Sequence, residues 1–322
     1  MQRCEVVLLG TVLTSFDPWR SPLCTCPRKY TINPYTGCSH RCLYCYTTAY
    51  IRSRESKPKQ YLNHRLRRDL KYIDPRFPVD MSLSSDPYPP EERILGITRA
   101  VLELLLPAGL RVQITTKSDA LLRDIDLLSR YNVAVSVTIT TLDDSLARRL
   151  EPNAPPPSNR LKALEILKDH NVPFSVRVDP VIPYLNDDEN SLRELVREVA
   201  SIGAKHVVTS TYKARPDNFA RMVNAFPELK AKWMKLYYPG GKIKLGYAYA
   251  PIQLRRRILW PVVDEANKLK LTYATCRENL TTPKYFRAPS CDGTHLIPSR
   301  IELRSRTAER IRLENFFSNS RV

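Results

Sequence analysis

The chain has 322 residues, of which 43% are hydrophobic and 26% charged, a composition that is ordinary for a globular protein of one large or two modest domains. Lysine and arginine number 51 against 33 acidic residues, and the net charge of +18 favours a polyanion such as nucleic acid as partner; adaptation for solubility or a compositional bias is the alternative. No apolar run is long enough for a membrane span, and the short N-terminal run VVLLGTVL is predicted to be a strand, so we expect a cytoplasmic protein with no membrane partner.

Short β-rich runs alternate with helical patterns from residue 29 onward. Such alternation is typical of successive βα units that form a parallel sheet. With six strands of this kind, we predict an α/β fold, a partial (β/α)6 TIM-like barrel with its helices outside and a C-terminal extension. The predicted strands are 29–33, 78–85, 111–118, 133–142, 173–182 and 205–211, and the predicted helices between them are 91–106, 120–131, 158–170 and 191–202.

The pattern is looser after residue 212. We predict a loop or hairpin at 237–251, a helix with an internal proline at 254–269 and a strand at 271–275. The arginine-rich tail is predicted to be a basic helix, either on nucleic acid or docked on the barrel. The expected parts of the chain are an N-terminal extension (1–28), the barrel core (29–212), a part that completes the barrel mouth and the substrate side (213–298) and the basic tail (299–322).

Three polar motifs follow predicted strands. The segment CSHRCLYCY follows the first strand, SSDPYPP ends the second, and TTKSD ends the third. Enzymes with parallel barrels place their chemistry at the carboxyl ends of the strands. We therefore expect these motifs to converge on one mouth. The alternative reading of Asp86 and Tyr88 is a simple turn, because Asp-Pro starts turns well.

Cys38, Cys42 and Cys45 are spaced C-x3-C-x2-C, with Tyr44 and Tyr46 on either side of the last cysteine. A structural zinc site normally has four ligands, and a disulfide would leave one thiol over. Three thiolates bind three irons of a cubane and leave the fourth iron open for a cofactor or substrate. The pattern therefore favours an iron–sulfur cluster over zinc or a disulfide.

The motif resembles that of the radical S-adenosylmethionine (radical SAM) superfamily. Together with SSDPYPPEERILGITR, TTKSDALLRDIDLL, SVTITTLDDSLARRLEPNAPPPSNRL and DPVIPYLND, it is similar to the spore photoproduct lyase-like branch over roughly residues 29–295. The resemblance implies a [4Fe–4S] cluster that binds S-adenosyl-L-methionine at its open iron. One electron then cleaves the cofactor to a 5′-deoxyadenosyl radical. The resemblance also implies a protein that donates this electron, such as ferredoxin or flavodoxin.

The resemblance also assigns residues. Cys38, Cys42 and Cys45 ligate the cluster, and cofactor contacts fall to Tyr46, Ser85, Lys117 and Ser136. Tyr44 and Tyr46 are the candidates for a catalytic relay. One position departs from the family: spore photoproduct lyase has a cysteine as hydrogen-atom donor where this chain has Ser84. A hydroxyl donates a hydrogen atom poorly, so we expect another substrate than the photoproduct.

Three hypotheses of function stay open. The first is a radical SAM enzyme that acts on nucleic acid, and the second is one that modifies a protein or a small molecule. The third is a nucleic-acid-binding protein whose cluster takes no part in radical catalysis. The motifs TTKS and SSDPY argue against the third, because a cluster that only senses or stabilises needs no cofactor pocket.

Five cysteines lie outside the motif. Cys24, Cys26, Cys276 and Cys291 form either a second iron–sulfur or zinc site or, as the favoured reading, no site at all, with Cys276 and Cys291 as buried thiols and the C-x-C pair as incidental. Cys4 is expected in the core. Three charged residues near later strand ends either line the substrate mouth or form internal ion pairs; they are Glu151, Arg177 and Asp179.

Overall fold

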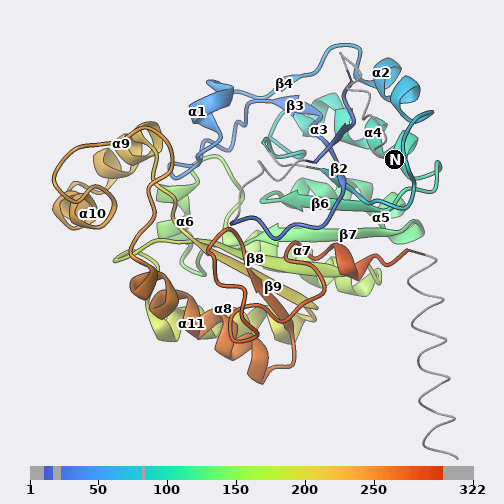
Figure 1. Cartoon of the computed structure of the whole chain (residues 1–322). Coiled ribbons are helices and arrows are strands. Elements are labelled where there is room, and N and C mark those ends of the chain that lie inside the picture. The colour runs from blue at the N-terminus through green and yellow to red at the C-terminus, as the bar shows by residue number, and fades with distance from the viewer. Residues whose placement is uncertain (1–10, 17–22, 82–83, 300–322) are drawn as a thin grey trace, which may run out of the picture.

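The structure is a computed structural model that describes residues 11–16, 23–81 and 84–299. An eight-stranded sheet runs through its centre (Figure 1), in the order β1-β2-β5-β6-β7-β8-β9-β10. β1 is antiparallel to β2, and the other neighbours are parallel. The strands are β1 (Thr14–Ser15), β2 (Tyr30–Ile32), β5 (Val79–Met81), β6 (Val112–Thr116), β7 (Val133–Thr138), β8 (Phe174–Val181), β9 (His206–Thr211) and β10 (Thr272–Thr275).

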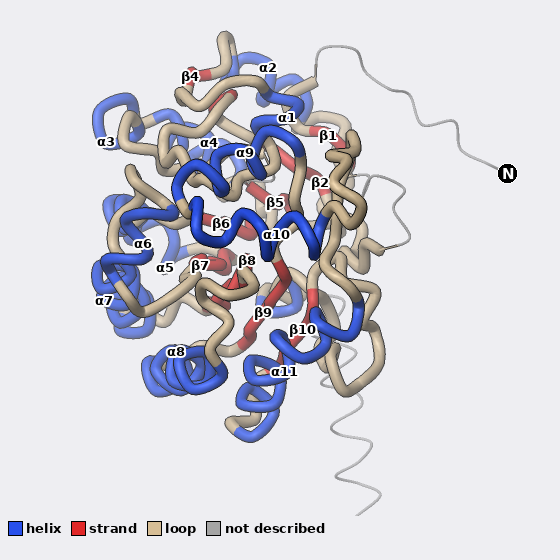
Figure 2. Tube along the Cα trace, turned by 90° about the vertical axis from the view of Figure 1, so that its left-hand side faces the viewer, coloured by secondary structure: helices blue, strands red, loops and turns tan. Residues whose placement is uncertain are grey.

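The parallel strands follow one another in space as they do in the chain. This unreversed order is that of a barrel rather than of a doubly wound sheet, and the helices that connect the parallel strands from β5 to β9 lie along one side of the sheet (Figure 2). A separate antiparallel pair joins β3 (Tyr35–Thr36) to β4 (Lys57–Pro58). The main outer helices are α4 (Ile97–Leu105), α5 (Ile125–Arg130), α7 (Pro157–Asp169), α8 (Glu189–Ile202) and α11 (Ile252–Lys268). The shorter ones are α1 (Thr48–Ile51), α2 (Leu62–Asp69), α3 (Glu92–Leu95) and α6 (Asp144–Leu150).

The main core lies between the sheet and the outer helices. All six residues of β7 are buried, as expected for a parallel strand that is covered on both faces. Helix α8 buries one stripe of side chains at helical spacing: Leu192, Leu195, Val196, Val199 and Ile202. The predicted α/β fold with a parallel sheet is therefore confirmed.

Several boundaries differ from the prediction. The strand expected at 133–142 ends at Thr138, because Asp143 caps the start of α6 by accepting hydrogen bonds from Ser145 and Leu146. The helix expected at 91–106 is divided by Gly96, whose φ of +62° ends α3. The helix expected at 120–131 begins as the 3₁₀ turn η1 (Asp119–Asp124). The strand predicted at 271–275 is present as β10, and it pairs parallel with β9, so it extends the sheet beyond the six strands of the predicted barrel.

A second apolar cluster packs on the cysteine loop. It involves α9 (Pro216–Ala225) and α10 (Lys230–Tyr237), two helices that the sequence analysis missed, and 3₁₀ turn η2 (Pro227–Leu229) joins them. Phe219, Phe226 and Trp233 from this unit share the cluster with Cys42 and Tyr44. α9 lies beside α1 at one end of the sheet (Figure 1). These helices therefore support the loop that bears the three cysteines.

The remaining expectations concern the ends of the chain. Helix α11 carries Pro261 as predicted, and a third 3₁₀ turn, η3 (Thr294–Leu296), follows β10. Cys4, most of the N-terminal apolar run and nearly all of the basic tail lie outside the described residues. In the parts that are described, no helix has both the length and the apolar character that crossing a membrane requires. The division into four parts stays a prediction.

Candidate active site

The carboxyl ends of the parallel strands border one cavity of ≈ 630 Å³. Cys38, Cys42 and Cys45 line it from the loop after β2. Residues 84–86 reach it after β5, and residues 115–117 reach it from the end of β6. The expected convergence of the three motifs on one mouth is confirmed.

The cysteine loop has its shape because Gly37 precedes it. Gly37 has a φ of +79°, and a Cβ at this position would lie 2.1 Å from the carbonyl oxygen of Glu55. Only glycine fits so close an approach of two backbone segments. Farther along the loop, the amide of Leu43 donates to the carbonyl of Leu150 at 2.8 Å. Cys42 is buried, whereas Cys38 and Cys45 are half-buried and face the cavity.

A buried carboxylate holds the other side of this loop. Glu151 accepts hydrogen bonds from the hydroxyl of Tyr44, from Thr140 at 3.1 Å and from the guanidinium of Arg160. Burial would raise the pKa of Glu151, but the charges of Arg160 and Lys117 prevail and hold it below its ordinary value. The hydroxyl of Tyr44 is thus committed to an internal contact. Of the two alternatives expected for Glu151, the structure shows the internal ion pair, which it forms with Arg160.

Asp86 ties the three strand-end loops together. One carboxylate oxygen accepts from the amide of Tyr88 at 2.9 Å and from the hydroxyl of Thr116 at 2.6 Å. The other accepts from the amide of Lys117 at 2.9 Å and faces Nδ1 of His40 at 3.6 Å. The turn expected at Asp86 is present, and its carboxylate also fixes the backbone of the lysine predicted to contact the cofactor.

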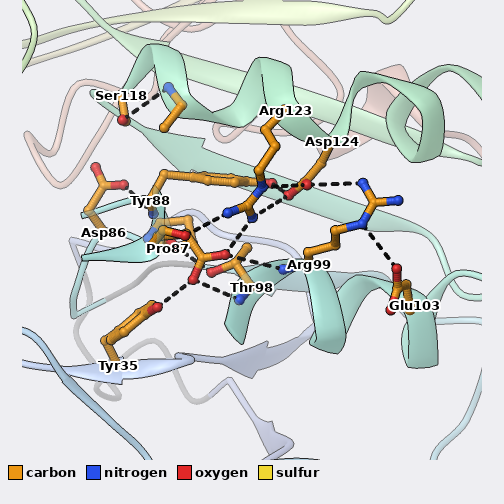
Figure 3. Close-up of polar contacts among 12 residues, drawn as sticks. Tyr35, Asp86, Pro87, Tyr88, Thr98, Arg99, Glu103, Ser118, Arg123 and Asp124 are labelled. Carbon is orange, nitrogen blue, oxygen red and sulfur yellow. Dashed lines mark hydrogen bonds and ion pairs between the residues drawn. The ribbon is translucent and has the colours of Figure 1, made fainter. Parts of the chain in front are cut away.

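A network of hydrogen bonds and ion pairs holds Tyr88, which lies two residues after Asp86 (Figure 3). The hydroxyl of Tyr88 donates at 3.0 Å to Asp124, which also accepts from Arg99 and Arg123. Burial, followed by the charge of Asp124, raises the pKa of Tyr88, so its hydroxyl stays a donor. Fully buried Glu92 accepts from Arg123 at 2.6 Å and from the hydroxyl of Tyr35. The DPY segment is therefore held rigidly at the cavity wall.

A match to one known family model shows the superfamily of this chain. The model of the radical SAM superfamily matches residues 32–196. This chain belongs to the radical SAM superfamily. An uncharacterized protein of Mycobacterium tuberculosis is 27% identical over 243 residues, which cover 69% of this chain and 71% of that protein. An uncharacterized protein of Methanocaldococcus jannaschii is 30% identical over 179 residues, which cover 52% of this chain and 65% of that protein.

Solved structures share the fold of this radical SAM protein. A spore photoproduct lyase mutant with bound AdoMet and dinucleoside spore photoproduct has a TM-score of 0.61 and 16% identity, with coverage of 80% of this chain and 76% of that chain. SuiB of Streptococcus suis bound to S-adenosylmethionine has a TM-score of 0.51 and 16% identity, with coverage of 76% of this chain and 49% of that chain. At these identities the likeness concerns the fold alone.

The family implies a [4Fe–4S] cluster and S-adenosyl-L-methionine, and the cavity wall suits both. Among the described residues, no three His, Cys, Asp or Glu side chains converge as ligands of a single ion do. A cubane has no such requirement, because each cysteine binds a different iron. In the same cavity, Oγ1 of Thr31 and Oδ1 of Asp80 are buried and make no hydrogen bond within the described protein. These atoms are available to a polar cofactor.

The residues that the resemblance assigned to the cofactor differ in position. Ser85 lines the cavity and donates to the carbonyl of Tyr35 at 2.8 Å. Lys117 also lines the cavity. Burial alone would lower its pKa, but the negative charges of Cys42 and Glu151 outweigh this effect and raise the pKa of Lys117. Tyr46 lies on the wall. Ser136 is fully buried inside β7 and is not part of the described cavity wall, which Thr138 reaches instead. The four cofactor contacts stay predictions.

Arg177 and Asp179 were expected either to line the cavity or to form an internal ion pair, and they do both. They form an ion pair at 2.7 Å, and both line the cavity. Burial would raise the pKa of Asp179, but Arg177 and Lys213 hold it below its ordinary value. Sequence reasoning missed the buried Lys213, which also lines the cavity and pairs with Glu278 at 3.3 Å. Two ion pairs, Arg177–Asp179 and Lys213–Glu278, therefore lie on this side of the cavity.

Proposed function

We propose that this protein is a radical SAM enzyme whose substrate is a nucleic acid. When bound, the cluster and S-adenosyl-L-methionine would supply the 5′-deoxyadenosyl radical. Cys38, Cys42 and Cys45 would hold the cluster. Lys117 would pair with the carboxylate of the cofactor, since its backbone is fixed by Asp86 and its Nζ lies over the ring of Tyr44, 5.7 Å from its centroid.

The observation that carries the nucleic-acid proposal is a group of aromatic and basic side chains at the mouth of the cavity. Tyr46 packs edge-to-face on Tyr247, with ring centroids 5.7 Å apart. The guanidinium of Arg277 lies 4.6 Å from the ring centroid of Tyr247, and that of Arg215 lies 4.7 Å from it. Tyr46, Tyr50 and Arg277 line the cavity. Proteins bind unstacked bases on aromatic rings and guanidinium planes, and phosphates on arginines.

The choice of substrate rests on this aromatic and basic group and on the net charge of +18, because the fold accommodates different substrates. The similar solved structures include spore photoproduct lyase with a dinucleoside photoproduct and SuiB with the precursor peptide SuiA. Ser84 lines the cavity, and its amide donates to Oδ1 of Asn33 at 3.0 Å. Its hydroxyl is a poor hydrogen-atom donor, which supports a reaction other than photoproduct reversal by the lyase route.

Binding of single-stranded DNA and RNA oligonucleotides, measured by fluorescence anisotropy, tests the proposal. Tyr247→Ala and Arg277→Ala should each weaken binding about 5- to 150-fold, since one stacked base contributes ~1–3 kcal/mol. Lys162→Ala, an exposed change on α7, should leave binding unaltered. Affinity should fall steeply between about 50 and 200 mM salt, because contacts with phosphates release counterions and binding therefore weakens as salt is added.

Binding without salt dependence, or equal binding by all three variants, would contradict the proposal and point to a peptide or small-molecule substrate. Mass spectrometry of nucleic acid from cells with and without the gene then identifies the reaction. A nucleoside modification that is missing without the gene is the expected result. A reduced ferredoxin or flavodoxin is the proposed source of the electron.

A further inference from the structure

Four cysteines outside the motif come together on the wall of the same cavity. Cys24 and Cys26 precede β2, Cys276 follows β10 directly, and Cys291 lies in the loop between β10 and η3. More than 200 residues separate the first pair from the second pair. No disulfide is formed by these four, which are free thiols.

Two of the sulfurs are in direct contact. The thiol of Cys291 donates to Sγ of Cys26 across 3.6 Å, and Cys24 lies close enough to interact with Cys26. Cys276 lies close enough to interact electrostatically with Cys26 and is hydrogen-bonded to the guanidinium of Arg177. The cluster is thus a compact set of four soft donors that borders a cavity.

Side-chain and backbone contacts fix the segments of Cys26, Cys276 and Cys291. Lys29 pairs with Asp80 of β5 and, at 2.7 Å, with Asp292, so it joins the segment of Cys26 to that of Cys291. The carbonyl of Cys291 also meets Nε2 of His206 at 3.2 Å. The amide of Cys276 donates to the carbonyl of Thr209 at 2.9 Å and continues the β9–β10 pairing. The donor set is therefore preorganised by the sheet.

The surroundings suit a negatively charged metal centre. Lys29, Arg177 and Lys213 line the cavity beside these cysteines, and each of them also pairs with a carboxylate. Lys29 interacts electrostatically with Cys26, and Arg177 and Lys213 interact with Cys276. Thiolate ligands carry one negative charge each, and such basic neighbours partly compensate that charge in a site of low polarity.

We propose that Cys24, Cys26, Cys276 and Cys291 bind a second iron–sulfur cluster. Four thiolates are the ligand set of both [2Fe–2S] and [4Fe–4S] clusters. A single zinc ion fits less well, because no three donors of the described residues converge on one point. The proposal goes beyond the proposed function and does not rest on a nucleic-acid substrate. It places two metal centres on one cavity wall.

The test compares iron in protein reconstituted anaerobically with iron and sulfide. The full chain should hold about six or eight irons, namely four in the first cluster and two or four in the second. Cys38→Ser/Cys42→Ser/Cys45→Ser should keep the irons of the second cluster alone and show its Mössbauer signature. Cys276→Ser/Cys291→Ser should keep four irons and still bind S-adenosyl-L-methionine.

Loss of all iron from the triple variant, with about four irons in the full chain, would overturn the proposal. One zinc per chain in place of the second set of irons would overturn it as well. If the double variant fails to fold, the triple variant decides alone, because its iron has no ligands in the first motif. The substrate of the enzyme affects none of these counts, so failure here is distinct from failure of the nucleic-acid proposal.

Discussion

Substituting glutamine for Glu151 should destabilise the protein strongly, because it leaves the charge of Arg160 without a partner. The side chains of Glu151 and Arg160 are 0% and 1% exposed, so no water replaces the lost carboxylate. Glutamine still accepts hydrogen bonds from Tyr44 and Thr140, but its charge is gone. Breaking a buried ion pair from one side costs about 3–5 kcal/mol. We expect a loss of this order in the free energy of unfolding.

Urea unfolding followed by circular dichroism measures the effect. With a slope of roughly 2–3 kcal/mol per molar urea, the midpoint of Glu151→Gln should fall by about 1–2 M. Glu151→Gln/Arg160→Gln should recover part of the loss, since neither charge is then left alone. Asp74→Asn removes a carboxylate from an exposed pair with Arg76 and should leave the midpoint close to that of the unaltered protein. An unchanged midpoint and slope for Glu151→Gln would refute the reasoning.

Two further predictions concern the cofactor and the cluster. Lys117→Met should weaken binding of S-adenosyl-L-methionine about 10- to 100-fold in calorimetry, because a hydrogen bond to a charged group contributes ~1.5–3 kcal/mol; unchanged affinity would remove Lys117 from the cofactor site. Gly37→Ala should reduce iron loading of the first cluster, since its Cβ would lie 2.1 Å from Glu55. Gly109→Ala is the matched control: Gly109 has the same φ of +79° but no atom within 4 Å of the added Cβ, and equal iron contents would contradict the argument.

The sequence predicts the parallel sheet well because the signal is local. Strands such as β7 and helices such as α8 show the apolar periods of buried strands and amphipathic helices within one short segment. The positions of the cysteine, SSDPY and TTKS motifs at strand ends are visible in the same way. Their convergence follows from parallel strands, whose carboxyl ends share one edge.

Other features depend on contacts between distant segments. The pairing of β10 with β9, the contact of Glu151 with Tyr44, and the meeting of Cys26 with Cys291 join residues that no local pattern connects. The break at Gly96 shows a further limit: the apolar pattern continues across a residue whose backbone ends the helix. Sequence spacing therefore located the first cysteine set, whereas the second set was only one of two readings of the sequence, and its proximity in space is seen in the folded chain.

Reductive cleavage of S-adenosyl-L-methionine tests the central claim most directly. Protein reconstituted anaerobically is incubated with the cofactor and dithionite, and 5′-deoxyadenosine is quantified by liquid chromatography. The account predicts 5′-deoxyadenosine from the unaltered protein and none from Cys45→Ala. Absence of 5′-deoxyadenosine from protein whose first cluster is fully loaded with iron would contradict it.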